Sequence, residues 1–126
     1  MAVRTPIGRA RGLGSAKEGT HHWWMQRVTA IALVPLALWF VASVASMAGA
    51  DYVAMRAWAG QPITATLLIS LIVATFYHAA LGMQVVYEDY VHPHWVKVVF
   101  DIATKLVFFA FAVACIFSIL KLAFAA

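Results

Sequence analysis

A single histidine, His78, stands inside a long apolar run, Ile63–Tyr87, that contains no Asp, Glu, Lys or Arg. Ionisable side chains are costly in a bilayer and usually face the interior of a helix bundle, so this residue is a candidate functional site. A buried imidazole among small residues can hold a haem iron. Asp89 and Tyr90, just beyond the run, are an acid and a phenol that can handle a quinone at the membrane edge.

A stripe of small residues passes through His78. Its members recur at every fourth position, and they are Ser70, Ala74, His78 and Gly82. Positions four apart lie on nearly one face of a helix, and small side chains let a neighbouring helix or a flat cofactor come close. Gly82 offers no side chain that would clash with a porphyrin beside His78; plain helix packing around a hydrogen-bonded His78 is the alternative. Asp89 returns to this face three turns later, about 16 Å away at about 1.5 Å per residue.

The composition is that of a membrane protein. Of the 126 residues, 64% are hydrophobic and 11% are charged, against about 25% charged in an ordinary soluble domain. Three segments, near residues 24–47, 63–87 and 98–122, are long enough to cross a hydrocarbon core about 30 Å thick. Because the loops between them are short, the sequence predicts an all-α membrane protein with three transmembrane helices in a bundle. This leaves no room for a soluble catalytic domain, so any chemistry lies between helices or is shared with partner chains.

The basic residues predict the orientation of the chain. Most of them precede or open the first span or lie near the second connection, and these are Arg4, Arg9, Arg11, Lys17, Arg27, Lys97 and Lys105. The positive-inside rule therefore places the N-terminus in the cytoplasm and the C-terminus in the periplasm, across a bacterial inner membrane. We expect residues 1–22 to form a mature cytoplasmic arm that a partner surface orders, and residues 23–126 to form the membrane domain. Because topology explains the basic arm, we expect no nucleic-acid partner.

Three single residues inside the spans have specific expectations. Arg27 lies about one turn inside the first span, where it either snorkels to the interface or pairs with an anionic group such as a haem propionate. Pro35 removes a backbone hydrogen bond in the middle of that span and is expected to bend it. Cys115, in the third span, is expected to be a small buried hydrophobe.

The two connections carry turn signals. The outer connection, residues 49–62, ends in Gly-Gln-Pro, which is typical of a turn followed by the start of a helix. In the inner connection, residues 88–96, Pro93 forces His92 out of helical geometry. His92 and His94 form a His-x-His pair that could bind a metal. Because no third ligand is obvious, we expect them to be interfacial histidines without a metal.

Two stretches resemble one known family, the small hydrophobic membrane anchor of succinate dehydrogenase (respiratory complex II). Residues 19–33, GTHHWWMQRVTAIAL, are similar to the entrance of the first helix in that family. Residues 78–83, HAALGM, followed by DYV at 89–91 and by Pro93, resemble the H-A-x-x-G-M…D-Y-V-x-P motif of its second helix. With three spans and an N-terminus inside, the resemblance covers nearly the whole chain.

The resemblance implies site residues. The family's two small anchor chains together hold a b-type haem and bind ubiquinone, so His78 would be the axial haem ligand from this chain and thus its metal ligand. Tyr90 would hydrogen-bond a quinone carbonyl, and Asp89 would support that site or its proton supply. Arg27 and His21 match positions associated with the haem propionates, although the doubled histidine leaves open which of the two imidazoles matters.

The resemblance also implies partners. These are a second membrane anchor subunit of the cytochrome b556 type, an iron–sulfur subunit, a flavoprotein subunit and membrane lipid. FAD and the iron–sulfur clusters would belong to the partner subunits only, because this chain contains no flavin motif and no cysteine cluster.

The residues agree independently with a shared cofactor. His78 is the only histidine within the three predicted spans, so a bis-histidine haem needs its second ligand from another polypeptide. The preferred function is therefore that of an anchor of succinate:quinone oxidoreductase that is not catalytic alone. A cofactor-free structural anchor and a fumarate reductase anchor are the alternatives. A transporter would need a polar path through several spans, and the span interiors offer only scattered Ser and Thr besides His78.

Overall fold

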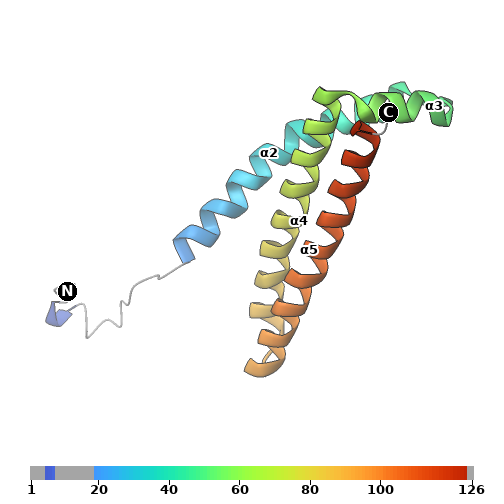
Figure 1. Cartoon of the computed structure of the whole chain (residues 1–126). Helices are drawn as coiled ribbons and strands as arrows, with labels where there is room; N and C mark the ends of the chain where they lie inside the picture. The colour runs from blue at the N-terminus through green and yellow to red at the C-terminus, as the bar shows by residue number, and fades with distance from the viewer. Residues whose placement is uncertain (1–4, 8–18, 125–126) are drawn as a thin grey trace.

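The computed structural model describes residues 5–7 and 19–124, and residues 19–124 are helical apart from short connections. The helices are α2 (Gly19–Ser46), α3 (Tyr52–Gly60), α4 (Pro62–Tyr90) and α5 (His94–Phe124) (Figure 1). α2, α4 and α5 are each long and apolar enough to cross a membrane. The predicted all-α fold with three spans is therefore confirmed. Most of the predicted N-terminal arm, with its four basic residues, lies outside the described residues.

Each span is a longer helix than the apolar segment that predicted it. α2 begins at residue 19 rather than 24, α4 ends at 90 rather than 87, and α5 begins at 94 rather than 98. Hydropathy reports how much chain lies in hydrocarbon, whereas a helix continues while its backbone hydrogen bonds can form. α2 runs through Pro35 without interruption, although the proline removes one of its backbone hydrogen bonds. The chain leaves α4 at Val91 and is not helical at His92, directly before Pro93, as predicted.

The outer connection, predicted as a loop over residues 49–62, contains the helix α3. The Asp51 side chain caps this helix by accepting a hydrogen bond from the Ala54 N–H at 2.8 Å. Just before the cap, Gly49 has a φ of 86°, which glycine adopts without steric cost. The predicted Gly-Gln-Pro turn is confirmed, because Gln61 is extended and α4 starts at the proline. The helix was missed because its nine residues are too few to cross a membrane, so the segment between the two spans was interpreted as a loop.

α4 is the central helix of the structure. It packs against α2 and against α5, whereas no Cα atoms of α2 and α5 come within 8 Å of each other. Figure 1 shows α2 diverging from the other two spans toward its N-terminal end, while α3 lies across the ends of α4 and α5. The three spans therefore form an open arrangement rather than a closed bundle.

The buried side chains also gather on α4. Among the described residues they are Thr29, Ala59, Thr64, Ala65, Leu68 and Leu81. Four of these belong to α4 and none to α5. Cys115, predicted to be buried, is only half-buried, because within the described residues α5 packs against α4 and α3 alone and much of its surface stays open.

The shortest polar link between α4 and α5 joins two hydroxyl groups. The oxygen atoms of Tyr87 and Thr104, both half-buried, lie 2.6 Å apart. We expect Tyr87→Phe to lower the free energy of unfolding of the assembled complex by about 0.5–1.5 kcal/mol, the net contribution of one hydrogen bond. Thermal unfolding of the purified complex in detergent measures this. Tyr77→Phe, which removes another hydroxyl from α4, is the control, and equal losses in both variants would contradict the assignment.

Gly60, the last residue of α3, lies against the C-terminal turn of α5. A Cβ added to Gly60 would lie 3.0 Å from the carbonyl oxygen of Leu122, a backbone atom that cannot rotate away. We expect Gly60→Val to destabilise the complex by about 1–3 kcal/mol, as overpacking does, and to lower its unfolding temperature. Gly19→Val is the control, because no atom lies within 4 Å of the Cβ added there. An unchanged unfolding temperature for Gly60→Val would refute the close packing.

Candidate functional site

His78 lies on the face of α4 that packs against α2, and both nitrogens of its half-buried ring are within hydrogen-bond distance of α2. Nδ1 is 2.9 Å from Thr29 Oγ1, and Nε2 is 3.3 Å from Gln26 Nε2. These contacts join two helices across about fifty residues of sequence. The histidine of the second span therefore faces another helix, as polar groups within membranes generally do.

Thr29 is buried, with 8% of its surface exposed, and its hydroxyl has three polar neighbours. Besides Nδ1 of His78, these are the backbone carbonyl oxygens of Met25 at 2.7 Å and of Gln26 at 3.1 Å. Bonds from a Thr hydroxyl to carbonyls three and four residues back are a known feature of membrane helices. They hold the Thr29 oxygen in place beside the imidazole ring.

Two buried polar atoms of α2 have no hydrogen-bond partner within the described part of the chain. They are Gln26 Oε1 and His22 Nε2. His22, Gln26 and Thr29 are spaced i, i+4 and i+7, so they share one face of α2. Because nearly all buried polar atoms in native proteins have a partner, this face has hydrogen-bonding capacity left for a further group.

The second half of the small-residue stripe of α4 contacts α2. A Cβ added to Gly82 would lie 3.7 Å from Gln26 Nε2, so the Gln26 side chain contacts both His78 and Gly82. At the other end of the stripe, Ser70 is exposed and its hydroxyl donates to the Thr66 carbonyl at 2.8 Å. The neighbouring helix that the stripe predicted is therefore α2.

Arg27 and His21 are exposed on α2, whereas the α2 side chains beside the His78 ring nitrogens are those of Gln26 and Thr29. The Arg27 guanidinium stacks on the ring of Trp23, with Cζ 3.6 Å from the ring centroid, and its Nη1 donates to the Trp23 carbonyl at 3.3 Å.

The two adjacent histidines at the start of α2 differ in their surroundings. His21 is exposed, whereas His22 is half-buried and has a buried Nε2. His22 is thus the one packed into the chain.

Asp89 and Tyr90 lie in the last turn of α4, and both are exposed, Tyr90 with 77% of its surface. They follow His78 by eleven and twelve residues, about 16–18 Å along the helix axis. The site residues predicted from the sequence thus fall into three separate groups. One lies against α2, one lies on the exposed surface of α2, and one lies at the end of α4.

The described residues do not form a metal site by themselves. Within residues 5–7 and 19–124, no group of three His, Cys, Asp or Glu side chains is arranged to hold a metal ion. His92 and His94 are exposed at the α4–α5 connection. A metal ion at His78 would therefore need further donor atoms from outside the described residues.

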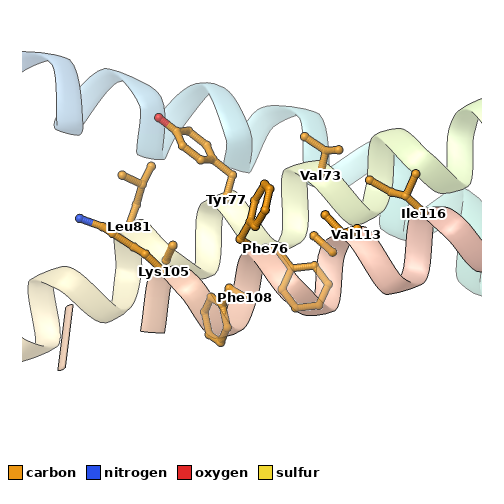
Figure 2. A pocket seen from close by; sticks show the side chains of 11 residues that line it. Val73, Phe76, Tyr77, Leu81, Lys105, Phe108, Val113 and Ile116 are labelled. Carbon is orange, nitrogen blue, oxygen red and sulfur yellow. The ribbon is translucent and has the colours of Figure 1, made fainter. Parts of the chain in front are cut away.

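A cavity of about 400 Å³ lies between α4 and α5, and none of the predicted site residues lines it. Figure 2 shows Phe76 and Phe108 near its middle, Lys105 at one end and Ile116 at the other. The Lys105 ammonium is paired with the Asp101 carboxylate at 2.8 Å. This apolar space suits a lipid chain or an apolar side chain, and it does not mark the site of the chemistry.

Sequence reasoning gave no role to Gln26 or Thr29, and it left open whether His21 or His22 matters. A signal was present, because these polar side chains recur at helical spacing near the start of an otherwise apolar span. Such a row in a membrane helix favours hydrogen bonds to a neighbouring helix. His78, the only histidine within the three spans predicted from the sequence, was the natural partner.

Comparisons with known proteins agree on one family. The family model described as succinate dehydrogenase/fumarate reductase transmembrane subunit matches residues 1–120. The chain is 39% identical over 103 residues to the succinate dehydrogenase hydrophobic membrane anchor subunit of Rickettsia bellii, with 82% of each chain covered. It is 37% identical over 92 residues to that of Rickettsia conorii, covering 72% of this chain and 73% of the relative. For the protein from Paracoccus denitrificans the identity is 34% over 90 residues, covering 71% and 70%.

Proposed function

Because this chain belongs to the succinate dehydrogenase/fumarate reductase transmembrane subunit family, we propose that it carries electrons to ubiquinone as a membrane anchor subunit of succinate dehydrogenase. It is a multi-pass protein of the bacterial inner membrane. It shares a b-type haem and a ubiquinone site with partner subunits, and it passes electrons from succinate oxidation to the quinone. The chain is not catalytic alone.

The hydrogen bonding of His78 is the observation that supports the haem assignment best. Metal-ligating histidines usually donate their other ring N–H to an acceptor, which orients the ring. Here Nδ1 lies 2.9 Å from the Thr29 hydroxyl, so Nε2 is the nitrogen available to coordinate iron. A haem supplies one-electron transfer when bound. His78 would hold this haem from this chain, and a second ligand would come from the second anchor subunit, since no other histidine lies in the predicted spans.

The side chains around His78 fit a bound cofactor. The Gln26 amide, whose Nε2 lies 3.3 Å from His78 Nε2, would have to turn away for that nitrogen to hold iron, and its Oε1 has no partner among the described residues. Gly82 keeps the adjacent turn of α4 free of a side chain. Arg27 and His21 provide exposed groups for the haem propionates, and a positive guanidinium pairs well with a carboxylate.

We assign the quinone site to the end of α4. The exposed Tyr90 hydroxyl donates a hydrogen bond to a quinone carbonyl oxygen and stabilises the negative charge that develops there on reduction. Reduction of a quinone to a quinol takes two electrons and two protons. The adjacent Asp89, also exposed, supports this site or its proton supply. This end of α4 faces the cytoplasm in the proposed orientation, so the protons come from cytoplasmic water.

The remaining parts of the reaction belong to other subunits. An anchor subunit of succinate dehydrogenase works in a complex, and we assign FAD to the flavoprotein subunit and the clusters to the iron–sulfur subunit. The cytoplasmic arm, which precedes α2, contacts these hydrophilic partners. The C-terminus lies in the periplasm. Membrane lipid covers the span surfaces that no partner covers.

A cofactor-free structural anchor is the second candidate, and one observation favours it. Both ring nitrogens of His78 already have hydrogen-bond partners on α2, so the side chain can serve as a packing contact alone. The reduced-minus-oxidised absorption spectrum of the purified complex separates the two candidates. A b-type signal supports the haem-sharing anchor, and a spectrum without haem supports the structural anchor. A fumarate reductase anchor differs only in the direction of electron flow, which the relative rates of succinate oxidation and fumarate reduction would decide.

A further inference from the structure

We propose that Thr29 is a positioning residue for His78: its hydroxyl oxygen holds the imidazole in the tautomer that carries its proton on Nδ1, which leaves the Nε2 lone pair for a ligand. The inference rests on the proposed haem function of His78 and adds a residue to it. It follows from counting the protons and lone pairs of three side chains.

The Thr29 hydroxyl has one proton and two lone pairs, and it lies within hydrogen-bond distance of three groups. The carbonyl oxygens of Met25, at 2.7 Å, and Gln26, at 3.1 Å, can only accept. The single Thr29 proton is therefore directed at these carbonyls. A lone pair of Oγ1 then faces His78 at 2.9 Å, so the ring nitrogen Nδ1 must be the donor.

The amide nitrogen of Gln26 lies 3.3 Å from His78 Nε2 and can only donate a hydrogen bond. A neutral imidazole with its proton on Nδ1 has a lone pair on Nε2, which accepts this bond. Both contacts therefore favour the same tautomer, and Gln26 covers Nε2 as a weakly bound cap that a stronger ligand displaces.

Burial makes the Thr29 contact effective. Because only 8% of Thr29 is exposed, water does not compete for the Nδ1–H, and a hydrogen bond in such surroundings is electrostatically stronger than in water. A donor bond from the distal nitrogen raises the basicity of a metal-ligating histidine. A more basic ligand favours the more highly charged ferric iron, so Thr29 is expected to lower the haem reduction potential.

Redox titration of the b-type absorption in the intact purified complex tests this role. Thr29→Val keeps the shape of the side chain and removes the acceptor, whereas Thr29→Ser keeps the acceptor. We expect Thr29→Val to favour the reduced haem by about three- to tenfold, where tenfold equals about 59 mV for a one-electron couple. Thr29→Ser should retain the wild-type potential. Thr29→Ala, which is smaller, should shift it in the same direction as valine.

Thr66→Val is the matched control. Thr66 Oγ1 donates to the Pro62 carbonyl four residues back at 2.8 Å, the same kind of bond that Thr29 makes, but on the exposed face of α4. The haem reduction potential of the Thr66→Val complex should equal that of the wild-type complex. An equal shift in Thr66→Val and Thr29→Val would overturn the proposal, because the effect would then come from losing any such hydroxyl.

The other outcomes separate the inference from the function on which it rests. A wild-type potential in Thr29→Val, with haem retained, would overturn the positioning role and leave the haem function standing. Failure of both the valine and alanine variants to assemble would assign Thr29 to folding and would also overturn the role. A wild-type complex without haem would overturn the proposed haem function itself, and the Thr29 inference with it.

Discussion

His78→Ala, made in the intact complex, is expected to abolish the b-type absorption signal while the complex still assembles. Removing a residue that merely supports a metal ligand typically weakens metal binding by about 10–100-fold, so removing the ligand itself should reduce the haem content further than that. The helix pair should survive, because α2 and α4 also pack against each other at positions other than His78. The measurement is the reduced-minus-oxidised spectrum per mole of complex, with subunit content determined on the same sample.

His92→Ala is the matched control for this variant. His92 is exposed at the α4–α5 connection, so its removal should leave the haem content unchanged. An unaltered spectrum in His78→Ala would refute the ligand assignment. Loss of haem together with loss of the subunits would instead show that His78 is needed for assembly.

Tyr90→Phe is expected to lower succinate–quinone activity by about ten- to a hundredfold. A buried hydrogen-bond donor aimed at developing negative charge contributes about 2.7–4 kcal/mol to the transition state. The exposed Tyr90 should contribute less, about 1.4–2.7 kcal/mol, since each factor of ten corresponds to about 1.36 kcal/mol. Phenylalanine preserves the aromatic ring. Because Tyr90 is 77% exposed, the ring has few packing contacts that the substitution could disturb. Succinate oxidation with a soluble artificial acceptor should stay at the wild-type rate, since that acceptor does not use the quinone site.

The ratio of the two activities is the decisive quantity for Tyr90. Tyr52→Phe is the control: Tyr52 is similarly exposed, at 73%, but lies at the start of α3. It should leave both activities unchanged. Equal losses of both activities in Tyr90→Phe would indicate a general defect of assembly and would count against a hydrogen bond to the quinone.

The spans could be predicted because their physical cause is local. Each of the three apolar segments is long enough to cross the bilayer by itself, and its composition alone carries that information. The ends of the helices and α3 depend on capping and backbone hydrogen bonding instead. The bond from Ala54 to the Asp51 side chain fixes the start of α3, and such a bond leaves little trace in hydropathy.

The candidate site was predictable residue by residue but not as an arrangement. His78 stood out because it is costly in an apolar span, whereas the partners of its ring depend on how α2 packs against α4. Gln26 and Thr29 are ordinary polar residues until that packing places them beside the imidazole. The open arrangement of α2 and α5 on α4 was equally unpredictable. Short connections between the helices are compatible with a closed bundle as well as with an open arrangement.

The open arrangement affects the steady-state abundance of this protein in the cell. With α4 alone in close contact with both other spans, and with no buried residue on α5, a copy that has not met its partners has little internal packing to resist unfolding. Proteases and chaperones remove marginally stable chains continuously. The abundance of this subunit should therefore follow the supply of its partners, and surplus copies should turn over quickly, which makes the stoichiometry of the complex self-correcting.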